Sequence, residues 1–168
     1  MRKEERDVMK VGIIADTHDN LPYVRKALTV FGREGCEAII HAGDYVAPFA
    51  LKALLEFPGR VYGVLGNNDG ERSGLRKLMP ELNKGPLKVT LGGCRITAIH
   101  QLARLSQTDR AETDVIVCGH THLAEITDGR PLVINPGECA GWLTGHSTVV
   151  ILETETRTAE LVDLGAWA

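Results

Sequence analysis

The chain has 168 residues, 43% of them hydrophobic, and 19 basic against 22 acidic residues give a formal net charge of −3. This length and apolar content fit one compact domain, in which folding buries roughly 70% of the unfolded surface. The mixed, nearly balanced charges exclude the strongly basic surface on which proteins that grip a nucleic-acid backbone depend, so polymeric nucleic acid is not expected as a partner.

The four cysteines are widely spaced and form no CxxC pair, which argues against a zinc ribbon or a redox motif and favours reduced, buried thiols. The apolar run at residues 11–15 is too short for a signal peptide, and no segment has the eighteen or so apolar residues of a membrane span. We predict a cytoplasmic protein without a membrane segment, with a flexible extension over residues 1–9 and a single domain over residues 10–168.

Short runs rich in β-branched residues recur along the chain and predict strands at residues 11–15, 38–42, 60–65, 94–99, 114–118, 131–135 and 147–152. Most of these runs are almost continuously apolar, which is typical of strands buried on both faces. A further strand is predicted over residues 87–93, because only a Gly-Gly turn signal separates it from the run that starts at Cys94.

Helical patterns separate the first three runs. One stripe, after Asn20 and with Pro22 in its first turn, consists of Leu21, Val24, Leu28 and Phe31. A second stripe after Pro48 consists of Phe49, Ala53 and Leu54. The N-terminal half therefore reads βαβαβ with parallel strands, and the second half a mixed or mainly antiparallel sheet. The predicted fold is α/β, with two mixed sheets face to face and flanked by helices, a four-layer αββα sandwich.

Residue types that bind metals follow five of the apolar runs. These blocks are Asp16-Thr17-His18, Gly43-Asp44, Gly66-Asn67-Asn68-Asp69, His100 and Gly119-His120-Thr121-His122. Loops at the carboxyl ends of strands converge in α/β sheets, and alternate residues of an extended segment point the same way. Glycine directly before three proposed ligands permits a close approach of the main chain to the site. The sequence therefore predicts one metal site built from five loops.

The five blocks, in this order, resemble the signature of the calcineurin-like metallophosphoesterases. The small size and the motif at residues 134–138, INPGE, resemble the compact YfcE-type phosphodiesterase branch, and the resemblance runs from about Lys10 to Leu164. It implies two metal ions that share one carboxylate. The first ion would be held by Asp16, His18 and His122, the second by Asn67, His100 and His120, and both would be bridged by Asp44.

The same resemblance implies a mechanism. Two carboxylates leave a net positive cluster, which binds a bridging water, lowers its pKa toward ~7 and supplies a hydroxide that attacks phosphorus. Nitrogen and oxygen ligands without a thiolate suit manganese, iron, cobalt, nickel or zinc, of which we favour manganese or nickel. Asp44 is then a catalytic residue as well as a ligand.

Three positions depart from the family pattern. Asn68 replaces the histidine that many members carry near the leaving group; with Asn67 it can bind the substrate phosphate, but it cannot deliver a proton. Gln101 follows His100, where the family usually has glycine. Glu138 replaces the serine of NPGS, and we expect it to be a solvated turn residue or the partner of a nearby arginine. His41 is expected to hydrogen-bond locally or to orient a ligand.

We therefore expect a binuclear-metal phosphodiesterase that acts on a small or activated diester, because an amide at residue 68 disfavours poor leaving groups. Three alternatives stay open: a phosphomonoesterase, a cyclic-nucleotide phosphodiesterase, and a non-catalytic scaffold that resembles the retromer subunit of this fold. The complete set of seven ligands favours catalysis over the scaffold. A DNA nuclease would need a basic platform that this chain lacks. The loop around Trp142 is a candidate contact of a homodimer or homotetramer.

Overall fold

The computed structural model describes residues 8–166, which form two five-stranded sheets, four α-helices and a short 3-10 helix. The strand order in the first sheet is β10-β9-β1-β2-β3 and in the second β4-β5-β6-β8-β7. The strands are β1 Lys10–Ile14, β2 Ala38–His41, β3 Arg60–Gly63, β4 Leu87–Leu91, β5 Cys94–Ala98, β6 Val115–Val117, β7 Ala124–Thr127, β8 Leu132–Pro136, β9 His146–Glu153 and β10 Thr158–Ala166. The helices are α1 Leu21–Arg33, α2 Pro48–Leu54, α3 Arg72–Leu78, η1 Leu102–Arg104 and α4 Gln107–Ala111.

Strand directions agree with the predicted topology. In the first sheet β1, β2 and β3 are parallel, which confirms the βαβαβ arrangement of the N-terminal half. In the second sheet β5, β6 and β8 are parallel, whereas the edge strands β4 and β7 are antiparallel to their neighbours. Both sheets are therefore mixed.

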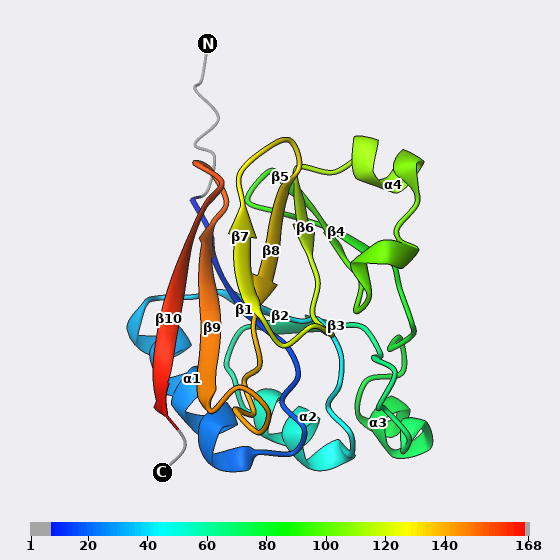
Figure 1. Ribbon diagram of the computed structural model, residues 1–168, viewed down its shortest axis with the longest axis vertical. Coiled ribbons are helices and arrows are strands. Elements are labelled where there is room, and N and C mark those ends of the chain that lie inside the picture. Colours follow the sequence, from blue (N-terminus) through cyan, green and yellow to red (C-terminus); the bar gives the residue numbers. More distant parts are fainter. Residues whose placement is uncertain (1–7, 167–168) are drawn as a thin grey trace.

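The apolar runs are buried on both faces because each sheet lies between two layers. In β1, Val11 and Ile13 point into the core between the sheets, whereas Ile14 points toward the helices. Helices α1 and α2 cover the outer face of the first sheet, and η1 with α4 lies on the side of the second (Figure 1). The four-layer αββα sandwich is confirmed.

Helix α1 follows the predicted stripe. Val24 and Phe31 are fully buried, and the Phe31 ring lies against the main chain at Gly12, where a Cβ atom would be 2.7 Å from the ring. The helix ends in a Schellman motif, with Gly35 at a φ of +74° and with the Cys36 amide bonded to the Phe31 carbonyl at 2.9 Å. This close packing holds β1, and the loop that follows it, in place.

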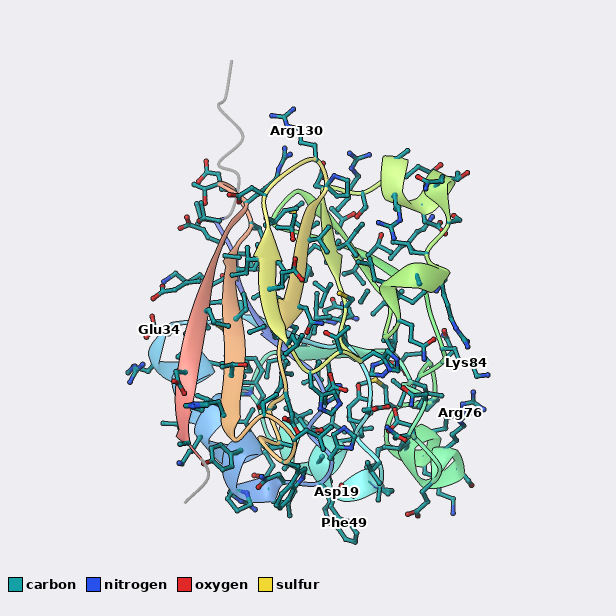
Figure 2. The ribbon with its side chains drawn as sticks, viewed as in Figure 1. Asp19, Glu34, Phe49, Arg76, Lys84 and Arg130 are labelled. Atoms are coloured by element: carbon teal, nitrogen blue, oxygen red, sulfur yellow. The ribbon has the colours of Figure 1, made fainter. Side chains whose placement is uncertain are left out.

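Several expectations differ from the structure. Phe49 is 64% exposed and points outward from α2 (Figure 2), because the buried face of this helix is formed by Ala50, Leu51, Ala53 and Leu54. The sequence reading missed α3, α4, β7 and β10. The predicted extension falls mainly on residues 1–7, outside the described residues. Met9, by contrast, exchanges hydrogen bonds with Thr154.

Two further observations concern the cysteines and the lengths of the helices. All four cysteines are buried and free, as predicted for reduced thiols. Within the described residues, no helix has the length and apolar character needed to cross a membrane.

Candidate metal centre

The five predicted blocks meet where the two sheets lie against each other. Loops after β1, β2 and β3 come from the first sheet, and loops after β5 and β6 come from the second. Hydrogen bonds tie the loops together, from the Asp16 amide to the Gly43 carbonyl and from the Gly119 amide to the His100 carbonyl, both 3.0 Å. The carboxyl ends of parallel strands from both halves of the chain thus form one site.

The first group of side chains surrounds one point, at which Asp16, His18, Asp44 and His122 each offer a donor atom, all within 4.8 Å of one another. His18 Nε2 lies 3.8 Å from Asp16 Oδ1 and 3.6 Å from Asp44 Oδ2, and His122 Nε2 lies 3.3 Å from Asp16 Oδ1. Asp16 Oδ1 and His18 Nε2 are buried without a hydrogen-bond partner among the described residues. Buried, unpaired oxygen and nitrogen donors directed at one point fit a divalent cation.

The second group lies on the other side of Asp44. Asn67 Oδ1 is 2.9 Å from His100 Nε2 and 2.9 Å from His120 Nδ1. His100 Nε2 is 3.5 Å from Asp44 Oδ2, the oxygen that also faces His18. Adjacent ligands with metal bonds of about 2.1 Å are about 3 Å apart, so this spacing also fits a cation. All seven predicted ligands are thus gathered in two groups that share Asp44.

The two carboxylates of the site stay ionised, as metal binding requires. Burial alone would raise the pKa of Asp16, but contacts with His122 and His18 hold it well below its usual range. The pKa of Asp44 is likewise lowered, because its contacts with His100 and Asn68 outweigh burial. Nδ1 of His100 lies 2.8 Å from the Ala42 carbonyl, which fixes the proton there and leaves Nε2 free as a ligand atom.

The backbone at the site is in an uncommon conformation. Five of the seven predicted ligands have a positive φ, namely Asp16 (51°), His18 (40°), Asp44 (64°), His120 (74°) and His122 (64°). Non-glycine residues adopt this region rarely, and such residues concentrate at functional sites, where the surrounding structure holds them. The clustering therefore supports a functional site independently of the side-chain chemistry.

The glycines before the ligands act as the sequence suggested. A Cβ atom at Gly66 would collide with the carboxylate of Asp44, and one at Gly119 would lie 2.7 Å from Asp16 Oδ2. Gly43 has a φ of +101° and packs against Gly66 and His100. The main chain can approach the carboxylates this closely only without side chains at these positions.

Asp69, the last residue of the GNND block, has a role that sequence reasoning missed. It is buried and accepts hydrogen bonds from the amides of Asp44 (3.0 Å), Val46 (2.7 Å) and Gly66 (2.7 Å). It thereby ties the loop after β3 to the loop after β2 and stabilises the positive φ of Val46, which is 79°. An acidic residue at the end of this block is visible in the sequence, but the sequence does not show whether its carboxylate faces a metal or the main chain.

The prediction for Glu138 was wrong. This side chain is only 1% exposed and has no arginine partner among the described residues. It accepts hydrogen bonds from the amides of Leu143 (2.9 Å) and Thr144 (3.0 Å), and its Oε1 lies 3.3 Å from His122 Nδ1. Burial raises its pKa, but these contacts outweigh burial and lower it. Glu138 therefore connects a predicted ligand to the loop between β8 and β9.

His41 lies beneath the site and is fully buried. Its Nδ1 accepts a hydrogen bond from the Gly43 amide, its Nε2 lies 3.0 Å from Thr17 Oγ1, and its ring stacks on Tyr45 with centroids 3.7 Å apart. Burial lowers the pKa of His41 to about 3, so the ring is neutral near pH 7. His41 therefore supports the loops after β1 and β2, which confirms the prediction that it hydrogen-bonds locally.

Two remaining residues are placed as follows. The Asn68 amide donates to Asp44 Oδ2 at 2.9 Å, so this side chain faces the shared carboxylate. The exposed His146 side chain lies 3.8 Å from Asp163 and has no contact with the predicted ligands.

Comparison with known proteins identifies the fold and the family. The family model for the calcineurin-like phosphoesterase superfamily domain matches residues 9–157. The chain belongs to this superfamily. It is accordingly a hydrolase of phosphoric esters, and the fold implies divalent metal ions, for which the cluster at Asp16, His18, Asp44 and His122 is a candidate site.

Individual relatives support this assignment. Phosphodiesterase MJ0936 of Methanocaldococcus jannaschii is 39% identical over 160 residues, which cover 89% of this chain and 95% of that protein. A solved structure described as a novel archaeal phosphodiesterase has a TM-score of 0.80 at 34% identity, covering 92% of this chain and 99% of that one.

More distant structures share the fold alone. The YfcE phosphoesterase of E. coli has a TM-score of 0.64 at 22% identity, covering 94% of this chain and all of that one. Vps29 of Entamoeba histolytica, solved with Zn²⁺, has a TM-score of 0.67 at 20% identity with the same coverage.

Proposed function

We propose that this protein is a binuclear-metal-dependent phosphodiesterase that hydrolyses a small or activated phosphodiester. The observation that carries the proposal is the gathering of seven metal-type side chains into two groups around one carboxylate, Asp44. Asp16, His18 and His122 would hold one ion, Asn67, His100 and His120 the other, and Asp44 would bridge them. Relatives named as phosphodiesterases support the same activity.

The donor set fits a pair of divalent cations, since it combines ionised carboxylates, imidazole nitrogens and an amide oxygen without a thiolate. When bound, two such ions lower the pKa of water toward ~7 and neutralise charge on a phosphoryl group. Manganese and nickel are our first choices. A cytoplasmic location and a homo-oligomeric state also stay predictions.

The chain's own residues set the substrate preference. Asn67 and Asn68 are both exposed, so they can approach a bound phosphate from the solvent side. Asn68 also steadies Asp44 through its main-chain amide and its side-chain amide, both 2.9 Å from the carboxylate. An amide cannot protonate a leaving group near neutral pH. An ester with a stable leaving group, such as 4-nitrophenolate, should therefore react faster than an ester that must release an alkyl alcohol.

A substrate panel tests this proposal. Purified protein, stripped of metal and then supplied with manganese or nickel, should hydrolyse bis(4-nitrophenyl) phosphate at least about tenfold faster than 4-nitrophenyl phosphate. Turnover of 2′,3′-cyclic AMP as the preferred substrate would favour the cyclic-nucleotide alternative, and preference for the monoester would favour a phosphatase. Absence of turnover for every ester with both metals would favour the non-catalytic scaffold, the remaining alternative for this fold.

A further inference from the structure

Two pockets of different character flank the candidate metal centre. The larger, of about 590 Å³, includes His120 in its lining, and most of its surface is apolar, with Leu102, Ala103 and Val133 in the lining beside one arginine and one glutamate. The smaller, of about 190 Å³, is lined by Asn67 and His100. Gln101 lines both pockets. A diester has two arms, and the site thus offers two unlike places to receive them.

The smaller pocket is basic. Arg72 at the start of α3, Lys84 in the loop before β4, and Arg104 at the end of η1 all line it, and no carboxylate does. Lys84 lies on the same side of the molecule as α3 (Figure 2). Three segments that are distant in sequence thus bring their positive charges to one pocket, in a chain whose formal net charge is −3.

These charges are not neutralised by the protein. Within the part of the chain that the structure describes, none of the three side chains forms an ion pair. Arg72 Nε donates to the Asp69 carbonyl at 3.0 Å, which anchors the side chain and leaves its terminal Nη groups available. Unpaired cations grouped in a concave site, next to a phosphoester centre, are suited to bind an anion.

The pocket is large enough for a phosphoryl group. A water molecule occupies about 30 Å³ in the liquid, so the smaller pocket holds roughly six waters or a group of about that many heavy atoms. A phosphoryl group fits this space. The larger pocket is in the range typical of sites for small organic molecules.

We propose that the substrate is an unsymmetrical phosphodiester, with an organic arm in the larger pocket and a second phosphoryl group on the other arm, bound by Arg72, Lys84 and Arg104. This proposal rests on the proposed function, because it assigns the arms of the same diester. It adds a substrate class, a diester that carries a further phosphate.

A matched pair of substrates tests the proposal. One is 4-nitrophenyl propyl phosphate, and the other is 4-nitrophenyl 3-phosphonopropyl phosphate, which adds only a terminal phosphonate. Phosphonates on tethers of two and four carbons test shorter and longer reaches. We expect kcat/KM for the best phosphonate to exceed that of its alkyl counterpart at least about tenfold. The ratio should fall as ionic strength rises, because the pocket is open to solvent.

Variants assign the effect to the pocket. Lys84→Ala and Arg104→Ala should each lower the phosphonate-to-alkyl ratio by about threefold or more. Lys77→Ala removes the same charge from α3 outside the pocket and should leave the ratio unchanged. A ratio near one in the wild type for all three tethers would overturn the proposal, as would equal ratios in all variants.

Failure of the proposed function would look different, because neither ester would then be hydrolysed. In that case the pocket is tested by titrating metal-free protein with inorganic phosphate, followed by NMR. Phosphate-dependent chemical-shift changes at the amides of Arg72, Lys84 and Arg104 would support anion binding in the pocket, if those of Arg72 and Lys84 disappear in Arg104→Ala. Absence of these shifts in the wild type would refute it.

Discussion

Three buried polar side chains, those of His41, Asp69 and Glu138, are not predicted metal ligands, but they hold the predicted ligands or their loops in place. Asp69 fixes the main chain on both sides of Asp44, His41 supports the turn at Gly43, and Glu138 lies against His122. Partners of this kind orient a ligand and raise its basicity, and their loss typically weakens metal binding 10- to 100-fold. At the scale of single residues, the site therefore extends beyond its seven predicted ligands.

Glu138 offers the sharpest test at this scale. Glu138→Ala should weaken manganese binding at the group containing His122 by about 10- to 100-fold, because it frees both the imidazole and the loop at Leu143. Glu138→Gln keeps an oxygen acceptor and should recover part of the affinity. Calorimetric titration of metal-free protein measures the effect, with the exposed Glu160→Ala as control. Wild-type affinity in a folded Glu138→Ala protein would mean that this contact has no part in metal binding.

At the scale of elements, the strands that could be predicted from the sequence are those with continuous apolar runs. The strands β1, β2 and β6 are apolar on both faces because they lie between two layers, and they therefore appear in the sequence as continuous apolar runs. Strand β10 was missed because it is an edge strand with no buried residue and with imperfect alternation of polar and apolar residues, and the five residues of α4 are too few to show a helical period. The ligands were predictable because each follows a clear strand. Glu138 was not, because its partners at residues 143 and 144 lie in a loop whose path the sequence does not specify.

The loop after β3 depends on glycine, which gives a second prediction. Gly66→Ala should displace the Asp44 carboxylate and reduce turnover and bound metal by at least about tenfold, because the added methyl group has no room. Gly32→Ala in α1 is the matched control, since a Cβ there meets nothing within 4 Å and φ is not positive. It should leave activity intact and stabilise the fold by up to about 1 kcal/mol, as measured by urea unfolding. Full activity in Gly66→Ala would contradict this prediction, because it would show that the loop accommodates a methyl group without displacing Asp44.

At the scale of the whole molecule, the site joins the two halves of the chain. The first sheet supplies Asp16, His18, Asp44 and Asn67, and the second supplies His100, His120 and His122. Asp44 has neighbours from both, with His18 Nε2 at 3.6 Å and His100 Nε2 at 3.5 Å. Packing of the two sheets through one apolar core therefore sets the geometry of the site. Metal binding should in turn stabilise the association of the sheets, because it favours the folded state alone.

The number of metal ions bound per chain tests the central claim most directly. Wild-type protein loaded with manganese and freed of excess metal should contain two ions per chain by elemental analysis. Asp44→Asn should contain fewer than one and lose turnover, because the shared carboxylate is removed, whereas the surface variant His146→Ala should keep both ions. Two ions and near-normal turnover in Asp44→Asn, or a wild-type protein that retains no metal, would contradict a binuclear centre bridged by Asp44.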